Sequence, residues 1–333
     1  MTHRAYVTWK QGLVSEALAR RGIGAEIAPM IELPPGSRRR ADLVAERKGR
    51  EIHLGFNAAG SRRIVDLSIC HILLPELVRL LPPLREALTQ VLGARQTADV
   101  AATASESGID LWLKTSQVLS PSGRQALIEL AERRGLARIS AGADADPVVI
   151  RRPPRAVFAG VSVALPPNAF LQPSTPGELA LTAIVKDALT GRKRIADLYA
   201  GCGTFTFALA AGRKVHAVEA NAPALAALAA AARALAGRVT SERRDLVREP
   251  LGAGELKTFD AVLFDPPRAG AREQAAEIAR SSLECAIGVS CNPVSFARDA
   301  RILIDGGFRL KKVCPVDQFP WSAHLELVGV FRR

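Results

Sequence analysis

A cysteine and a glutamate near the C-terminus have the chemistry of a nucleophile and a base. Cys291 follows a predicted strand, Ala286–Ser290, and precedes a predicted helix that begins after Asn292-Pro293. The dipole of that helix would favour the thiolate, which is the nucleophilic form. Glu326 lies in the apolar run His324–Phe331, where desolvation would raise the pKa of its carboxyl group toward that of a usable base. The alternatives are a structural buried cysteine and a strand carboxylate that faces solvent.

A second carboxylate, Asp265, follows the predicted strand Phe259–Phe264 in the turn Asp265-Pro266-Pro267-Arg268. Two prolines stiffen the turn and remove backbone donors, which suits a carboxylate held against a flat polar ring. A plain rigid β-turn is the alternative.

The stretch Ile195–Thr206 predicts a ligand cradle built from a strand, a glycine loop and the start of a helix. Gly201 and Gly203 permit positive φ and let the backbone approach a bound molecule. Glu219 ends the next predicted strand, Lys214–Ala220, where its carboxylate could accept hydrogen bonds from a ribose diol. The same acid serves NAD in dinucleotide enzymes, so this pattern alone leaves the ligand open.

The elements after Glu178 alternate between helices and strands, which predicts an α/β domain with a mostly parallel sheet. The last two strands, Phe308–Val313 and His324–Phe331, have no helix between them. We therefore expect the sheet to finish with an antiparallel hairpin, unlike the all-parallel nicotinamide fold.

The first half of the chain predicts a smaller mixed α/β domain, and we place the boundary between residues 1–171 and 172–333. Within it, the run Leu74–Ala87 predicts a helix interrupted by Pro82-Pro83. A basic sheet face there could contact phosphates, although a solvated edge protected by cations is the alternative. The arginines and lysines of this face are Arg38, Arg39, Arg40, Arg47, Lys48, Arg50, Arg62 and Arg63, joined by Arg151, Arg152 and Arg155.

The overall composition indicates a globular protein with a polyanionic partner. The formal net charge is +12 and the pI is about 10.1. The five cysteines show no Cys-x-x-Cys spacing, which fits a reducing cytoplasm and predicts neither a disulfide framework nor a self-contained zinc site. We expect no membrane-spanning segment and a monomer.

Five stretches together resemble the S-adenosylmethionine-dependent RNA 5-methyluridine methyltransferases, the family of the tRNA and 23S rRNA uracil-5 enzymes. The resemblance covers nearly the whole chain and is strongest from Phe170 onward. The stretches are Phe170–Pro173, Asp197–Thr206, Asp265–Gly270, Ser290–Pro293 and Asp317–Pro320 followed by Glu326.

The resemblance implies a class I, Rossmann-like methyltransferase domain preceded by a smaller RNA-binding domain. It makes Cys291 the nucleophile and Glu326 the base. Thr204 stands where many members have asparagine, and it keeps a hydrogen-bonding side chain. The residues that would line the S-adenosylmethionine site are Gln172, Tyr199, Gly201, Thr204, Glu219, Asp245 and Asp265.

The implied reaction is methyl transfer to carbon 5 of a uridine in RNA through a covalent cysteine–uracil intermediate, with 23S rRNA favoured over tRNA. One alternative is a methyltransferase acting on exocyclic amino groups, which would need neither Cys291 nor Glu326. Another is a non-catalytic RNA-binding relic of the family.

The 23S rRNA branch usually carries an N-terminal β-barrel and a cysteine cluster that binds iron and sulfur. Cys70 matches the last cluster ligand, but no other cysteine lies upstream of it. One thiolate cannot hold a cluster that needs four ligands, so we expect no iron–sulfur cluster in this chain. We expect either that the chain is a truncated reading of a longer gene or that this member has lost the cluster.

Overall fold

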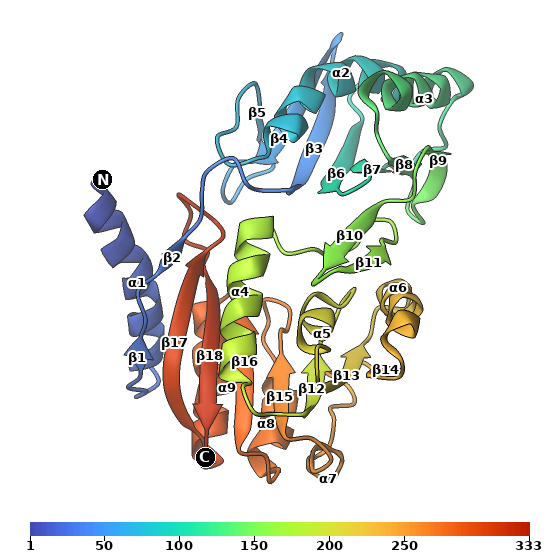
Figure 1. The fold of residues 1–333 in the computed structure, drawn as a ribbon. Coiled ribbons are helices and arrows are strands. Elements are labelled where there is room, and N and C mark those ends of the chain that lie inside the picture. Colours follow the sequence, from blue (N-terminus) through green and yellow to red (C-terminus); the bar gives the residue numbers. More distant parts are fainter. The chain divides into compact units, whose positions relative to one another are not determined.

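The computed structural model describes residues 1–333, which divide into two compact units (Figure 1). The large unit comprises Met1–Leu33, Phe158–Val161 and Pro176–Arg333, and the small unit comprises Pro34–Val157 and Ser162–Thr175. This division differs from the expected boundary after residue 171, because the first residues of the chain add strands to the C-terminal sheet. The division passes through a hairpin of β10 (Arg155–Phe158) and β11 (Val161–Ala164).

The large unit is built on a nine-stranded sheet with a parallel centre and an antiparallel end. The path runs β1-β17-β18-β16-β15-β12-β13-β14, and β2 also pairs with β17. This confirms the predicted α/β architecture and its terminal hairpin. The strands are β1 (Glu26–Ile27), β2 (Ile31–Glu32), β12 (Arg194–Leu198), β13 (Lys214–Glu219), β14 (Val239–Arg243), β15 (Ala261–Phe264), β16 (Cys285–Ser290), β17 (Arg309–Asp317) and β18 (Glu326–Arg332).

The strand order reverses between β12 and β15, since the chain proceeds from β12 to β13 on one side and later places β15 on the other. In open α/β sheets such a switch point forms the ligand crevice beyond the carboxyl ends of the strands. The loops that follow β12 and β15 therefore meet there. They carry the glycine loop and Asp265.

Helices cover both faces of this sheet (Figure 1). Apolar residues of α1, α7, α8 and α9 share one buried cluster with the strands. The helices are α1 (His3–Ala19), α4 (Thr175–Ala188), α5 (Thr204–Leu209), α6 (Ala222–Ala232), α7 (Ala253–Leu256), α8 (Arg272–Arg280) and α9 (Pro293–Asp305).

The small unit has a seven-stranded sheet of order β5-β4-β3-β6-β7-β8-β9, packed against two helices. Its pairs are antiparallel except for β7 with β8. The elements are β3 (Arg40–Lys48), β4 (Glu51–Asn57), β5 (Ile64–Asp66), α2 (Pro75–Val91), β6 (Thr97–Ser105), β7 (Gly108–Lys114), α3 (Pro121–Arg134), β8 (Arg138–Ala141) and β9 (Asp146–Ile150).

Helix α2 runs through Pro82-Pro83, so the predicted interruption is wrong. A proline inside a helix costs about 3 kcal/mol. Burying a leucine side chain contributes about 1.5–3 kcal/mol, and α2 buries leucines along its whole length. The buried leucines are Leu77, Leu80, Leu81, Leu84 and Leu88.

Two arginines expected on the phosphate-contacting face are structural instead. Arg39 is buried, and its Nε donates to the carbonyl of Gln172 at 3.0 Å. Arg47 donates from one guanidinium nitrogen to the carbonyls of Thr89 and Leu92, each at 2.7 Å. Their guanidinium groups donate hydrogen bonds to backbone carbonyls. A count of the cations in the sequence does not reveal these contacts. The small unit still exposes Arg50, Arg62 and Arg63.

Candidate active site

The loop after β12 has the backbone conformation of a ligand cradle. Tyr199, Gly201 and Gly203 all have positive φ, at 62°, 56° and 99°. A Cβ at Gly203 would lie 2.5 Å from the ring of Phe207, so only glycine fits there, whereas a Cβ at Gly201 would meet nothing within 4 Å. The tyrosine holds a strained conformation, a feature that clusters at functional sites. The open space at Gly201 lets a ligand approach the backbone.

A buried carboxylate beneath this loop has an oxygen with no hydrogen-bond partner. Asp197 accepts a hydrogen bond from the Thr206 hydroxyl at 2.5 Å through Oδ2, while its buried Oδ1 has no partner. Burial, the largest cause, raises the pKa of Asp197 to about 7, and the charge of Glu219 adds to the rise. An unpaired buried acceptor beside an open glycine loop fits a ligand that brings hydrogen-bond donors, as S-adenosylmethionine does.

Glu219, at the end of β13, is fixed by two backbone donors. Its Oε2 accepts from the N–H of Gly201 at 2.8 Å, and its Oε1 accepts from the N–H of Asn221 at 2.7 Å. Each carboxylate oxygen can accept a further bond, so the group remains able to bind a diol. The structure thus joins the glycine loop to the expected ribose-binding acid.

The other expected donor-site residues are placed as follows. Thr204 is the first residue of α5, and Asp245 follows β14 with its Oδ1 accepting from the N–H of Val247 at 3.1 Å. Strand β14 pairs in parallel with β13, so Asp245 lies at the same edge of the sheet as Glu219. Gln172 belongs to the small unit, where it is buried and its carbonyl accepts from Arg39.

Strand pairing brings the expected nucleophile and base together. Strands β16 and β18 are antiparallel, with Ser290 opposite Leu327. Cys291 is the next residue beyond Ser290, and Glu326 is the next beyond Leu327, so the two lie side by side at this end of the ladder. Glu326 is 5% exposed, so it does not face solvent.

The electrostatics of this pair agree with one expectation and contradict the other. Burial and the Asp265 carboxylate hold the pKa of Glu326 well above its usual range, as the sequence predicted. Burial also raises the pKa of the Cys291 thiol to about 11, and the Glu326 and Asp265 carboxylates add to that rise. The expected net stabilisation of the thiolate by the α9 dipole is therefore wrong. Desolvation and two nearby acids outweigh it.

The raised thiol pKa predicts slow alkylation of Cys291 near neutral pH. Below its pKa the thiolate fraction rises about tenfold per pH unit, so iodoacetamide labelling should accelerate accordingly between about pH 7 and 10. Glu326→Gln should speed labelling at pH values above the raised pKa of Glu326, where the wild-type carboxylate is ionised and raises the thiol pKa. Peptide mass spectrometry would follow the site, with buried Cys202 as the unreactive reference. Labelling that is fast and independent of pH near neutrality would contradict this picture.

The connection between β17 and β18 is held by two residues of α1 that the sequence reading missed. Lys10 is 0% exposed, and its Nζ donates to Oδ1 of Asp317 at 2.8 Å. The same Nζ donates to the carbonyls of Phe319 and His324, at 3.0 and 2.5 Å. The Tyr6 hydroxyl donates to Oδ2 of Asp317 at 2.5 Å. One sequence signal was available, since Lys10 occupies an apolar-face position four residues from Tyr6 and from Val14.

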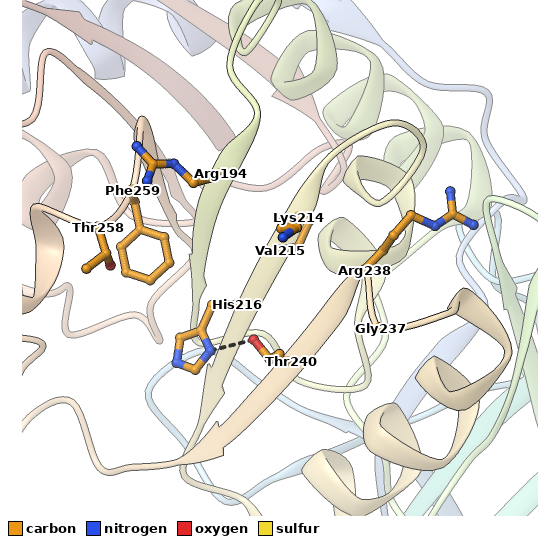
Figure 2. Close-up of a pocket in the computed structure, with 9 residues that line it drawn as sticks. All are labelled: Arg194, Lys214, Val215, His216, Gly237, Arg238, Thr240, Thr258 and Phe259. Atoms are coloured by element: carbon orange, nitrogen blue, oxygen red, sulfur yellow. Dashed lines mark hydrogen bonds between the residues drawn. The ribbon is translucent and has the colours of Figure 1, made fainter.

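A pocket of about 370 Å³ opens at the opposite edge of the sheet, where β12, β13 and β14 begin (Figure 2). His216 stacks on Phe259 with ring centroids 5.8 Å apart and bonds to the Thr240 hydroxyl. Arg194 binds Asp260, and Arg238 donates to two backbone carbonyls and extends away from His216. Since both guanidinium groups are engaged elsewhere, we do not assign an anion site to this pocket.

The structure contains no group of three or more His, Cys, Asp or Glu side chains arranged to hold a metal ion. Cys70 is a half-buried free thiol in the small unit. None of the helices is both long enough and apolar enough to cross a membrane.

The Glu219 geometry predicts a large effect on donor binding. Losing a charged acceptor to a ribose costs about 1.5–3 kcal/mol, so Glu219→Ala should weaken S-adenosylmethionine binding by about 10- to 150-fold in calorimetry. Glu242→Ala is the matched control, because Glu242 lies on the adjacent strand and binds His216 and Arg244. Unchanged donor affinity in Glu219→Ala, or equal binding of NAD by the wild type, would exclude this assignment.

Comparisons with known proteins identify the family. The model of the tRNA (uracil-5-)-methyltransferase family matches residues 161–333. An uncharacterized RNA methyltransferase of Mesorhizobium japonicum is 44% identical over 99% of this chain and 79% of its own length. The 23S rRNA (uracil(1939)-C(5))-methyltransferase RlmD of Pectobacterium atrosepticum is 31% identical over 98% of this chain and 76% of its own length.

A solved structure shows the same fold. The tRNA (uracil-54, C5)-methyltransferase of Pyrococcus abyssi, crystallised with S-adenosyl-L-homocysteine, superposes with a TM-score of 0.74 at 21% identity. The match covers 99% of this chain and 84% of that one. Together with the family match over more than half of the sequence, these findings show that the chain belongs to the tRNA (uracil-5-)-methyltransferase family and is an S-adenosylmethionine-dependent RNA (uracil-5-)-methyltransferase.

Proposed function

We propose that this protein methylates carbon 5 of a uridine in 23S rRNA through a covalent bond between Cys291 and the uracil ring. The observation that carries the proposal is the β16–β18 pairing, which sets Cys291 beside the buried carboxyl group of Glu326. A nucleophile next to a base, at the ligand edge of an α/β sheet, suits a reaction that needs both.

Carbon 5 of uracil is a weak nucleophile and requires activation. The Cys291 thiolate adds to carbon 6, which breaks the 5,6 double bond and places the electron pair at carbon 5 as an enolate. This electron pair would form the bond to the methyl group of S-adenosylmethionine as the bond between that methyl group and sulfur breaks, with S-adenosylhomocysteine as the leaving group. Glu326 then takes the proton from carbon 5, the double bond forms again, and the thiolate leaves carbon 6.

The reaction requires both Cys291 and Glu326 in their ionised forms, and their surroundings affect how readily each one ionises. Cys291 must lose its proton before addition, and Glu326 must be ionised when the carbon 5 proton leaves. Their raised pKa values both oppose this, so activity should rise with pH above neutrality. The Arg268 side chain lowers the thiol pKa in part.

The donor is proposed to bind over the glycine loop. Tyr199, Gly201, Thr204 and Glu219 would line it, since they surround the end of β12 and β13. Asp265 and Asp245 extend the same edge, and Gln172 completes the set on the family resemblance. The small unit, with exposed Arg50, Arg62 and Arg63, is proposed as the RNA-binding part, and the protein as a monomer.

The choice of 23S rRNA over tRNA rests on RlmD, the relative named for a 23S rRNA uracil. The test is methylation of 23S rRNA and tRNA transcripts with labelled donor, followed by nuclease digestion and mass spectrometry. We expect 5-methyluridine in 23S rRNA only. Product in tRNA alone would reverse the choice of RNA. A product methylated on an exocyclic amine would show that the enzyme does not methylate carbon 5.

A further inference from the structure

An exposed tryptophan lies at the tip of the connection between β17 and β18. Trp321 is 64% exposed, and its backbone φ is 59°, in the left-handed region that bulky residues rarely adopt. The side chain therefore contributes little to the core, although its backbone is held in a strained conformation. Strain of this kind is retained where the surrounding structure enforces it, and it clusters at functional sites.

Helix α1 enforces this conformation from both sides of the tryptophan. The backbone N–H of Trp321 donates to the Tyr6 hydroxyl at 3.0 Å. The buried Lys10 binds the carbonyls of Phe319 and His324, which flank the tryptophan in sequence. Because Tyr6 and Lys10 both bind Asp317, one hydrogen-bond network holds the backbone of the loop that carries Trp321.

The loop lies at the reactive end of the sheet. It connects Asp317, the last residue of β17, to Glu326, the first residue of β18. Strand β18 begins where β16 ends, next to Cys291. The loop that carries Trp321 therefore lies at the same end of the sheet as Cys291 and Glu326.

We propose that Trp321 is a stacking platform for a nucleobase next to the target uridine in the RNA strand. Single-stranded RNA is recognised largely by stacking of unstacked bases on aromatic side chains. A uridine must leave its own stack to reach a recessed site, which also exposes the faces of its neighbours. Because the backbone that carries the indole is already held by hydrogen bonds, less of the loop would have to be ordered when a base stacks on it. This inference rests on the proposed function and specifies how its substrate is held.

The test compares RNA binding and methylation in Trp321→Ala, Trp321→Phe and Trp9→Ala. Trp321→Ala should raise the Kd and KM for RNA about tenfold, within the range expected for one lost stacked base, while kcat changes little. Trp321→Phe should restore most of the affinity, because a phenyl ring still stacks. Trp9→Ala removes another exposed indole of the large unit and should change RNA affinity less than about twofold.

An abasic substrate identifies the stacked base. Removing the base next to the target uridine, on the side that stacks, should weaken wild-type binding as much as Trp321→Ala does, with no further loss when both are combined. The proposal would be overturned if the losses of affinity from the abasic site and from Trp321→Ala were fully additive on both sides of the target uridine. Wild-type RNA affinity in Trp321→Ala would also overturn it. If Trp321→Ala folds poorly, Trp321→Gly is the second variant to test. It should relieve the strained φ, melt no lower than the wild type and still bind RNA weakly.

The outcomes separate this inference from the proposed function. If the wild type makes no 5-methyluridine in any RNA, the proposed function fails, whatever the binding data show. If the wild type makes 5-methyluridine and Trp321→Ala binds RNA equally well, only the stacking platform is wrong.

Discussion

A Glu326→Gln variant is expected to accumulate RNA attached covalently to Cys291. The amide cannot take the carbon 5 proton, whereas addition of the thiolate and transfer of the methyl group precede that step and can still occur. The protein should therefore appear on a denaturing gel as a slow band that carries both RNA and the labelled methyl group. Normal turnover by Glu326→Gln would mean that another group is the base.

Cys291→Ala should show the opposite pattern. Removal of a nucleophile from a covalent mechanism eliminates its pathway, so methyl transfer should fall by about 10³-fold or more, and no slow band should form. The matched control is Cys70→Ala, which removes another half-buried thiol and should leave the rate unchanged. A slow band that persists in Cys291→Ala would show that the nucleophile is misassigned.

Lys10→Met is expected to destabilise the protein by about 3–5 kcal/mol, because it leaves the buried carboxylate of Asp317 without its counter-ion. It also removes the donors for the carbonyls of Phe319 and His324. The measurement is the urea midpoint of unfolding. The matched control is Lys48→Met, whose exposed pair with Glu46 should contribute about 0–1 kcal/mol.

A double variant tests the pair itself. Lys10→Met combined with Asp317→Asn should be more stable than the sum of the single changes predicts, because no unpaired charge remains buried. A Lys10→Met protein as stable as the wild type would show that the network around Asp317 does not hold the loop. The same variant should also lower RNA affinity, since the loop that presents Trp321 loses an anchor.

The sequence determined the parts of the fold whose signal is local. Alternation of strands and helices after Glu178 predicted the α/β sheet, and the missing helix between the last two strands predicted the terminal hairpin. The glycine loop and Glu219 were recognisable because tight turns and strand ends need particular residues. The path of α2 through Pro82-Pro83 was not predictable locally, since burial of its leucine face outweighs the proline cost.

Long-range contacts decided the rest. Local sequence left the orientation of Glu326 open, and the pairing of β18 with β16 placed it in the interior beside Cys291. The pKa of the Cys291 thiol rises mainly because the thiol is buried, and the carboxylates of Glu326 and Asp265, which folding brings near it, add to the rise. Lys10 and Asp317 are 307 residues apart, so no local pattern could pair them. The sequence alone thus determined which chemical groups this protein has, and only the tertiary structure decided their burial, charge environment and partners, because these depend on residues that folding brings together.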